Sequence, residues 1–271
     1  MIQQGQDQMG VLPSSLSDLI SDRKGVNMAS IQEPLRLRPT QGSRQKFPFS
    51  GLLTNKVLSA LPGAEFAQLL PYLEPVTLRT GEYVYELGQP VPFVYFPETV
   101  VISQMYFLED GSSAGVSIVG NDGLLGLSAI FDAPTARYWA VTTIGGTALR
   151  IRLDELRQEF RKGAALQKLI LSYADARLRQ LAQRSVCNTR HRLEERLCTW
   201  LLMIQDRAHS SDLPLTHESI SQHLGTRRAG VTNFCNVLRD NRVISYHRAM
   251  ITILDRNGLE ASACECYRRL K

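Results

Sequence analysis

Residues 75–151 carry a pattern of short apolar runs that is typical of strands. β-Branched and aromatic residues form the runs 83–85, 93–96, 100–107, 116–119 and 140–143. Turn signals separate these runs about every 8–12 residues, as in antiparallel sandwiches and barrels. Asp110-Gly111, between two alternating runs, is the strongest hairpin signal. The segment therefore predicts an antiparallel, jelly-roll-like β-barrel.

A long helical stretch follows at 164–186, where apolar residues recur in steps of three and four. About 24 helical residues span roughly 35 Å, more than one small barrel covers. We therefore expect a dimerisation helix that forms a seam with a second subunit; packing on its own barrel is the alternative. The predicted seam residues are Leu166, Ile170, Tyr173, Ala174, Leu178 and Leu181.

The remaining segments complete an α+β organisation. We expect a disordered tail at 1–50, rich in Gln, Ser, Pro and Arg, with a short helix near 16–20. Two short helices are expected between Asn55 and Leu73, and further helices at 153–160 and 190–207. The predicted units are the tail (1–50), the barrel (51–162), the dimerisation helix (163–189) and a C-terminal domain (190–271).

The net charge of +5 is unevenly distributed along the chain. Residues 51–160 sum to −6, whereas 161–190 sum to +6 and 191–271 to +3. An acidic first domain joined to a basic second half predicts that a polyanion binds the second half.

All five cysteines and all five histidines lie after residue 186. The barrel therefore offers no ligands for a haem, an iron–sulfur cluster or a Cys/His zinc site. Cys264-x-Cys266 is too close for a standard zinc knuckle, so we predict no metal and no cofactor. Cys198 and Cys235 are expected to be buried fillers, which leaves Cys187, Cys264 and Cys266 as redox candidates.

Several function classes lack their sequence signals. No stretch approaches the roughly 18 apolar residues of a membrane span, and the N-terminus lacks the apolar core of a signal peptide. We therefore expect a cytoplasmic protein with no membrane partner. GxSxG, HExxH and phosphate-binding glycine motifs are also missing from the sequence, so we predict that it is not an enzyme.

Residues 214–254 predict a winged helix-turn-helix. Thr216 is positioned to cap a helix, with Ser219 at the capping-box partner position. Gly225 permits the turn, and a second helix is expected from near Arg227 to Asp240. Strands at 243–245 and 251–254 supply the hairpin, and this order of elements is that of a winged helix-turn-helix.

The second helix of this motif has residues suited to DNA. Arginine pairs with guanine and asparagine with adenine in the major groove. Residues 225–248 hold five arginines and one acid, a local charge of +4 that suits phosphates. Contact with a protein is the alternative use of this fold. The predicted DNA-binding residues are Thr226, Arg227, Arg228, Thr232, Asn233 and Asn236.

The order of barrel, long helix and winged helix-turn-helix resembles the Crp/Fnr family of bacterial transcription regulators. The resemblance covers about residues 52–257. Its most specific part is LTHESISQHLGTRRAGVTNFCNVLRDNRVIS at 215–245, and the barrel adds Gly81-Glu82, Gly88 and the Gly-containing stretch 121–126. It implies a homodimer on palindromic DNA with recognition helices about 34 Å apart. RNA polymerase is a further candidate partner.

The resemblance also bears on individual site residues. It implies that His217 contacts a phosphate. The family's Arg-Glu-x-x-x-Arg recognition pattern falls on Arg228, Ala229 and Asn233, of which only the first matches. The half-site common in the family is therefore not expected here.

The effector-binding cassette departs further from the family. Cyclic-nucleotide-binding members have Gly-Glu-Leu followed by Arg-Ser, whereas this chain has Gly123-Leu124-Leu125 and Arg137 without the serine. The seam helix has Leu181-Ala182 in place of the expected Thr-Ser. Lost hydrogen-bond partners weaken such a site by several kcal/mol. We therefore predict an unknown effector other than cyclic AMP at Gly123, Leu124, Leu125 and Arg137. A ligand or redox sensor that acts through protein partners, without specific DNA binding, is the alternative function.

Overall fold

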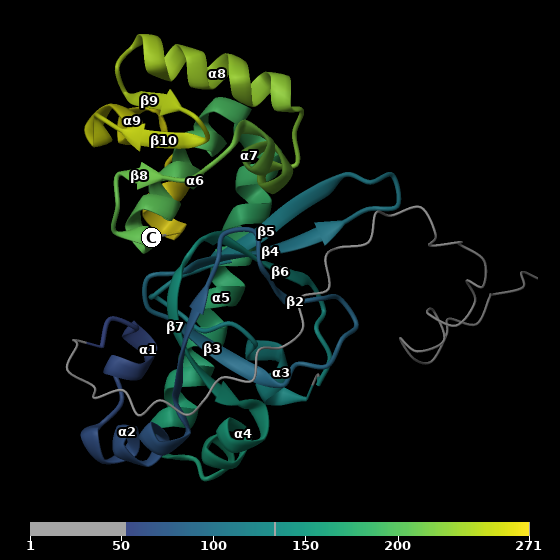
Figure 1. The fold of residues 1–271 in the computed structure, drawn as a ribbon, viewed down its shortest axis with the longest axis vertical. Coiled ribbons are helices and arrows are strands. Elements are labelled where there is room, and N and C mark those ends of the chain that lie inside the picture. The colour runs from purple at the N-terminus through teal and green to yellow at the C-terminus, as the bar shows by residue number, and fades with distance from the viewer. Residues whose placement is uncertain (1–52, 133, 271) are drawn as a thin grey trace, which may run out of the picture. The chain divides into compact units, whose positions relative to one another are not determined.

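The computed structural model describes residues 53–132 and 134–270 (Figure 1). The expected tail at 1–50 and its short helix lie outside these residues. Across 53–132 and 134–270, none of the helices combines the length and the apolar character that a membrane crossing needs.

The predicted barrel consists of two antiparallel sheets. These sheets and the helices that pack on them are called the β-domain below. One sheet has the order β1 (Glu74–Leu78), β7 (Gly146–Arg152), β3 (Phe93–Pro97). The other has the order β2 (Tyr83–Tyr85), β6 (Trp139–Ile144), β4 (Val101–Phe107), β5 (Ser113–Val119). Every predicted strand run is confirmed, while β1 and β7 were not predicted.

The β4–β5 hairpin forms at the predicted Asp110-Gly111 turn. Gly111 has a φ of 81°, which glycine adopts without the strain of a side chain. The Asp110 carboxylate accepts a hydrogen bond from the Ser112 backbone N–H at 2.9 Å. These local interactions hold the turn between two strands that pair from Ile102 to Phe107.

Helices close the ends of the β-domain, and its core lies between the sheets. Phe96, Ile102 and Leu156 are completely buried there. The helices are α1 (Lys56–Ser59), α2 (Gly63–Leu69), the 3-10 helix η1 (Leu70–Tyr72), α3 (Leu127–Phe131) and α4 (Leu153–Arg161). The break at Pro62-Gly63 that separates the first two was predicted.

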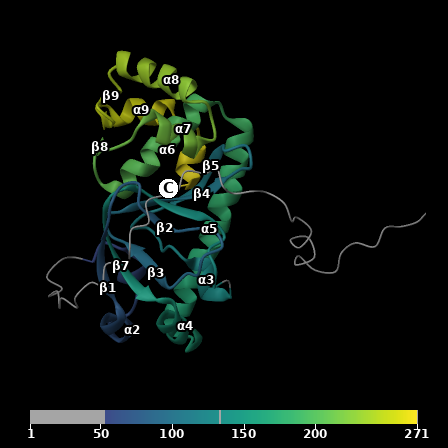
Figure 2. The ribbon, with the colours of Figure 1, turned by 45° about the vertical axis from the view of Figure 1, so that its right-hand side comes forward.

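The predicted dimerisation helix is α5 (Ala164–Arg190; Figure 2). Part of the predicted seam differs in the structure. Leu166 and Ile170 are buried in the core of their own β-domain, so the prediction that they face a second subunit is wrong. Tyr173 also packs there, and its hydroxyl donates to the Leu124 carbonyl at 3.1 Å. Leu178 and Leu181 face outward, with 68% and 39% of their surface exposed.

The C-terminal domain (residues 191–270) has the predicted winged helix-turn-helix and a core of its own. Trp200, Leu201 and Ile251 are almost completely buried at its centre. Its helices are α6 (Leu193–Ala208), α7 (His217–Leu224), α8 (Arg228–Asp240), α9 (Arg256–Ser262) and α10 (Cys266–Leu270). Its sheet has the order β8 (Asp212–Leu213), β10 (Met250–Ile253), β9 (Ile244–His247).

Helix α7 packs against β5 of the β-domain through the imidazole of His223. A Cβ atom at Gly115 would lie 2.3 Å from Nδ1 of His223, so only glycine admits this approach. The ring also lies 4.7 Å from that of Trp200. Neither ring nitrogen has a hydrogen-bond partner within the described chain. Burial, with the nearby charge of Arg184, lowers the pKa of His223 well below 6.5.

This buried imidazole predicts a loss of stability in mild acid. Below pH 6.5 the unfolded chain binds a proton at His223 that the folded chain excludes. The free energy of unfolding therefore falls with decreasing pH, by about 1.4 kcal/mol per pH unit from this group. Chemical unfolding between pH 7.5 and 5.5 should show His223→Leu to be at least as stable at pH 7.5 and less sensitive to acid. The exposed counterpart His247→Leu should keep the wild-type slope; equal slopes in all three proteins would contradict this assignment.

Candidate nucleic-acid interface

Both ends of α7 are fixed by specific interactions: a capping box at its start, and a left-handed glycine and a hydrogen bond from α6 at its end. The Thr216 side chain accepts from the Ser219 backbone N–H at 2.9 Å, and the Ser219 hydroxyl accepts from the Thr216 N–H at 3.1 Å. This confirms the capping box, with serine as the partner. Gly225 ends α7 with a φ of 61°, as predicted. Arg196 of α6 donates to the Leu224 carbonyl at 2.7 Å and so satisfies the end of α7.

One face of α8 is held in the core of the C-terminal domain. Val231, Cys235 and Leu238 are each no more than 3% exposed. Phe234 packs against the same cluster and is half-buried. Figure 1 shows α8 on the outside of this domain, beyond α6 and α7. The opposite face of the helix is therefore left at the surface.

The predicted base-reading residues lie at this surface. Arg227, Arg228 and Asn233 are exposed, and Asn236 and Thr226 are half-exposed. Throughout residues 53–132 and 134–270, neither guanidinium group makes a hydrogen bond or an ion pair. The first turn of α8 thus presents two unpaired positive charges at a helix N-terminus, which favours a negatively charged ligand.

Two apolar residues of the outward face were not predicted as site residues. Ala229 is exposed, and Val237 has 49% of its surface exposed. Small apolar side chains of this kind suit contact with the methyl group of thymine. Their helical spacing from Asn233 was the signal that identifies them, because residues three or four apart share a face.

The structure contradicts the expected phosphate contact of His217. Its side chain is buried, with 8% of the residue exposed, and Nδ1 lies 3.0 Å from the Thr232 hydroxyl. The ring stacks on Tyr246 of β9 with centroids 4.2 Å apart. Burial, with the charge of Arg228, lowers the pKa of His217. His217 therefore connects α7, α8 and the hairpin. Its hydrogen bond also engages the hydroxyl of Thr232, a residue predicted to contact DNA.

The wing is a tighter hairpin than the sequence predicted. Strands β9 and β10 pair from Ile244 to Ile253, with only Arg248 and Ala249 between them. These two residues have φ angles of 46° and 65°, in the left-handed region that side chains disfavour. The strained turn places the exposed Arg248 side chain at the tip. Arg239, at the end of α8, is exposed and pairs with Asp240 at 3.1 Å.

The residues of the predicted effector site do not form an open site. Leu124 and Leu125 are buried in the β-domain core, so their side chains cannot line a polar cavity. Gly123 is also buried, and a Cβ there would lie 2.3 Å from the Tyr173 hydroxyl. Arg137 is exposed at the surface. In this structure the Tyr173 hydroxyl lies against Gly123 and Arg137 is at the surface, so the four residues do not share an open polar site, and effector binding by them stays a prediction.

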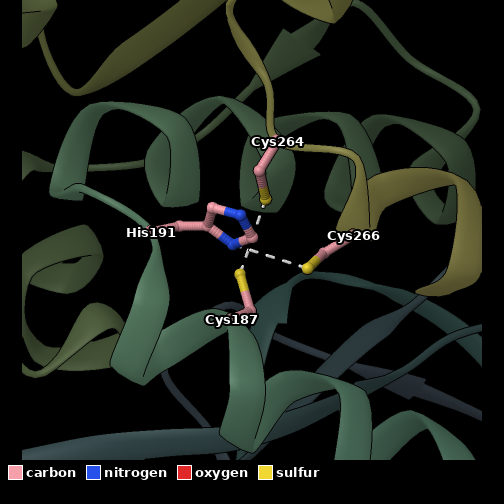
Figure 3. A group of neighbouring side chains, drawn as sticks. All are labelled: Cys187, His191, Cys264 and Cys266. Atoms are coloured by element: carbon pink, nitrogen blue, oxygen red, sulfur yellow. Dashed lines mark hydrogen bonds between the residues drawn. The ribbon is translucent and has the colours of Figure 1, made fainter.

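The cysteines divide into two groups. Cys198 and Cys235 are buried fillers, as predicted, and burial raises their pKa values to about 12 and about 11. Cys187, Cys264 and Cys266 instead gather around His191 (Figure 3). Sequence reasoning missed this group because its halves lie more than 70 residues apart. The helical spacing Cys187-x3-His191 was the available signal.

Comparison with known proteins shows which proteins this chain is similar to. Residues 195–262 match the model of the Crp-like helix-turn-helix domain. The global nitrogen regulator of Nostoc sp. is 23% identical over 188 residues, which cover 65% of this chain and 83% of that protein. The chain therefore carries a Crp-like helix-turn-helix domain. This domain, together with the likeness to these regulators, supports a role as a DNA-binding transcription regulator.

Two solved structures show the same fold. FixK2 from Bradyrhizobium japonicum is 18% identical with a TM-score of 0.61, covering 71% of this chain and 98% of that one. A regulator from Eubacterium rectale, described as a Crp/Fnr member, is 16% identical with a TM-score of 0.61. The match covers 79% of this chain and 99% of that one. The expected combination of a sheet-rich first domain and a C-terminal helix-turn-helix is confirmed.

Proposed function

We propose that this Crp/Fnr-like regulator binds two-fold symmetric duplex DNA as a homodimer, with α8 in the major groove. The observation that carries the proposal is the division of α8 into a buried apolar face and an outward face with unpaired Arg227 and Arg228. The guanidinium of Arg228 is suited to the two acceptors of guanine, and Asn233 to those of adenine.

Charge around α8 supports contact with the DNA backbone. Residues 225–248 carry a net charge of +4. Arg248 extends this charge to the tip of the wing, where the left-handed turn exposes it. We assign Arg239 and Arg248 to phosphates and Arg228 to a base, because phosphate contacts position a protein and base contacts specify the sequence.

A stripe on α5 supports the homodimer. The helix has 27 residues, a length of about 40 Å at 1.5 Å per residue. Leu171, Leu178 and Leu181 are 49%, 68% and 39% exposed, and Ala174 lies between them in a three-four spacing. This pattern is the seam of a two-helix coiled coil. The proposed seam thus keeps Ala174, Leu178 and Leu181 and replaces the buried Leu166 and Ile170 with Leu171.

The β-domain is proposed as the sensing part. The Tyr173 hydroxyl binds the Leu124 carbonyl, so a change near the cassette reaches the seam helix directly. The missing ribose carboxylate and phosphate serine favour an effector other than cyclic AMP. RNA polymerase is a proposed partner. A catalytic role has no support in the sequence motifs, and the relatives compared above are regulators.

Arg228→Ala should weaken specific binding by about 1–3 kcal/mol and relax the preference at one base pair of each half-site. The physical reason is the loss of a bidentate contact to a base edge. Competition binding against operator duplexes with each base replaced in turn measures both effects.

Arg239→Ala is the matched control in the same helix, because it removes a guanidinium assigned to a phosphate. It should weaken binding to all duplexes evenly and leave the base preference intact. An unchanged preference in Arg228→Ala would remove that residue from base reading.

Leu178→Glu should convert the dimer to monomers and weaken operator binding, because it places two like charges in an apolar seam. Sedimentation velocity measures the oligomeric state, and Ser172→Glu supplies the same charge at an exposed position beside the stripe. The control should stay dimeric. A dimer of Leu178→Glu with unaltered affinity between subunits would show that the seam lies elsewhere.

A further inference from the structure

Four potential metal ligands meet where α5 passes into the C-terminal domain. Cys187 lies in the last turn of α5 and His191 is its C-cap residue. Cys264 follows α9, and Cys266 begins α10. One ligand atom from each residue lies within 4.8 Å of all the others. Figure 3 shows the three sulfur atoms gathered around the imidazole.

The spacing of these atoms suits a single tetrahedral ion. Zinc bonds of about 2.3 Å to sulfur and about 2.0 Å to nitrogen place neighbouring ligand atoms roughly 3.5–3.8 Å apart. The Cys187 and Cys264 sulfurs are 3.5 Å apart, and the Cys266 sulfur is 3.5 Å from Nδ1 of His191. An iron–sulfur cluster has several irons joined by sulfide, so its ligand atoms are spread more widely than these.

The surrounding residues also fit a loaded site. Nε2 of His191 lies 3.2 Å from a Glu265 carboxylate oxygen, so Nδ1 is left to bind a metal. The Gln183 amide donates to the Cys266 sulfur at 3.0 Å, and the Thr199 hydroxyl lies 3.1 Å from the Cys264 sulfur. Such hydrogen bonds stabilise thiolates. Three thiolates and one divalent ion leave a charge of −1.

The buried guanidinium of Arg184 supplies a positive charge that would balance this net charge of −1. Arg184 is one turn before Cys187 on α5 and only 9% exposed. Its Nε has no hydrogen-bond partner in the described part of the chain. This guanidinium is an observation independent of the ligands, because a buried charge without a counter-charge is costly.

We propose that Cys187, His191, Cys264 and Cys266 bind one Zn²⁺ per chain as a structural site. All four positions of the tetrahedron come from the protein, which is the arrangement of structural zinc. As the ion binds, each thiol gives its proton to water and His191 binds as the neutral imidazole. Loading one ion therefore releases three protons.

The ion fastens the C-terminal segment to the seam helix. Two ligands belong to the end of α5 and two to residues 264–266, and the Gln180 side chain also donates to the Leu270 carbonyl at 3.3 Å. Removing the ion takes away this attachment of α10 to α5, at the point where α5 enters the domain that contains α8. The effect on DNA binding rests on the proposed function above, whereas metal binding does not.

Metal content of the full-length protein tests the site without DNA. The protein is purified in the presence of a reductant and without chelator, and zinc, iron and acid-labile sulfide are measured. Wild type should contain one zinc per chain. Apoprotein titrated with Co²⁺ should develop thiolate-to-cobalt charge-transfer bands and the intense visible bands of a tetrahedral ion at one equivalent. This titration needs no variant to fold.

Variants test the individual ligands. Cys264→Ser and Cys266→Ser should lower the affinity for Co²⁺ by roughly 100-fold or more, and Glu265→Gln by about tenfold. Cys235→Ser, the same change at a buried thiol outside the group, should bind one equivalent with the wild-type spectrum. Chelation should lower the melting temperature of the wild type and of Cys235→Ser but not that of Cys264→Ser.

Three results would overturn the metal site. They are wild-type protein with neither zinc nor a cobalt spectrum, stoichiometric iron and sulfide, and a Cys187–Cys264 disulfide in protein isolated under reductant. If one zinc is found and its removal leaves DNA affinity unchanged, the site stands and its coupling to α8 is refuted. Failure of DNA binding in fully loaded protein would count against the proposed function alone.

Discussion

Burial of one face of α8 is the interaction on which the DNA-binding surface depends. Val231, Cys235 and Leu238 are held in the core of the C-terminal domain. Each large apolar side chain contributes about 1.5–3 kcal/mol when it is fully buried. Rotation of α8 about its axis would expose these residues, so the positions of Arg228 and Asn233 at the surface follow from the packing beneath them. The DNA-binding surface of α8 is thus polar, whereas the face of α8 that fixes its position in the domain is apolar.

Helix α5 links the parts of the molecule because its two faces have different partners. Leu166, Ile170 and Tyr173 pack into the β-domain, whereas Leu171, Leu178 and Leu181 face outward. Its C-terminal turn carries Cys187 next to the junction with α6. A displacement of α5 relative to the β-domain therefore moves both the proposed seam and the base of the C-terminal domain. Packed interfaces of this kind switch between discrete arrangements rather than deform continuously.

Local signals explain what the sequence predicted well. Strand runs, the Asp110-Gly111 turn, the Thr216 cap and Gly225 each depend on neighbours within a few residues, and each was predicted correctly. The strand β1 begins with Glu-Pro, and the second half of β7 alternates apolar residues with two arginines. Neither strand therefore has the apolar character of the predicted runs. The Arg248-Ala249 turn lacks the glycine or asparagine typical of its geometry, so it too was missed.

Long-range packing explains the other errors. An apolar stripe does not reveal whether a helix packs on its own domain or on a partner, and this led to the wrong assignment of Leu166 and Ile170. His217 was placed on a phosphate by resemblance, but stacking on Tyr246 takes it into the interior. The Cys187–Cys266 group exists only because α10 folds back onto α5. The helical spacing Cys187-x3-His191 identifies one half of the group, but only the fold shows that Cys264 and Cys266 complete it.

Selection of bound sequences from a random duplex pool, with the full-length protein at two salt concentrations, tests the central claim most directly. The account predicts a two-fold symmetric sequence with half-sites centred about 34 Å apart, one turn of the duplex, and binding that weakens as salt rises. Enrichment of no sequence, or of a sequence without symmetry, would contradict the claim that two copies of α8 read the DNA together.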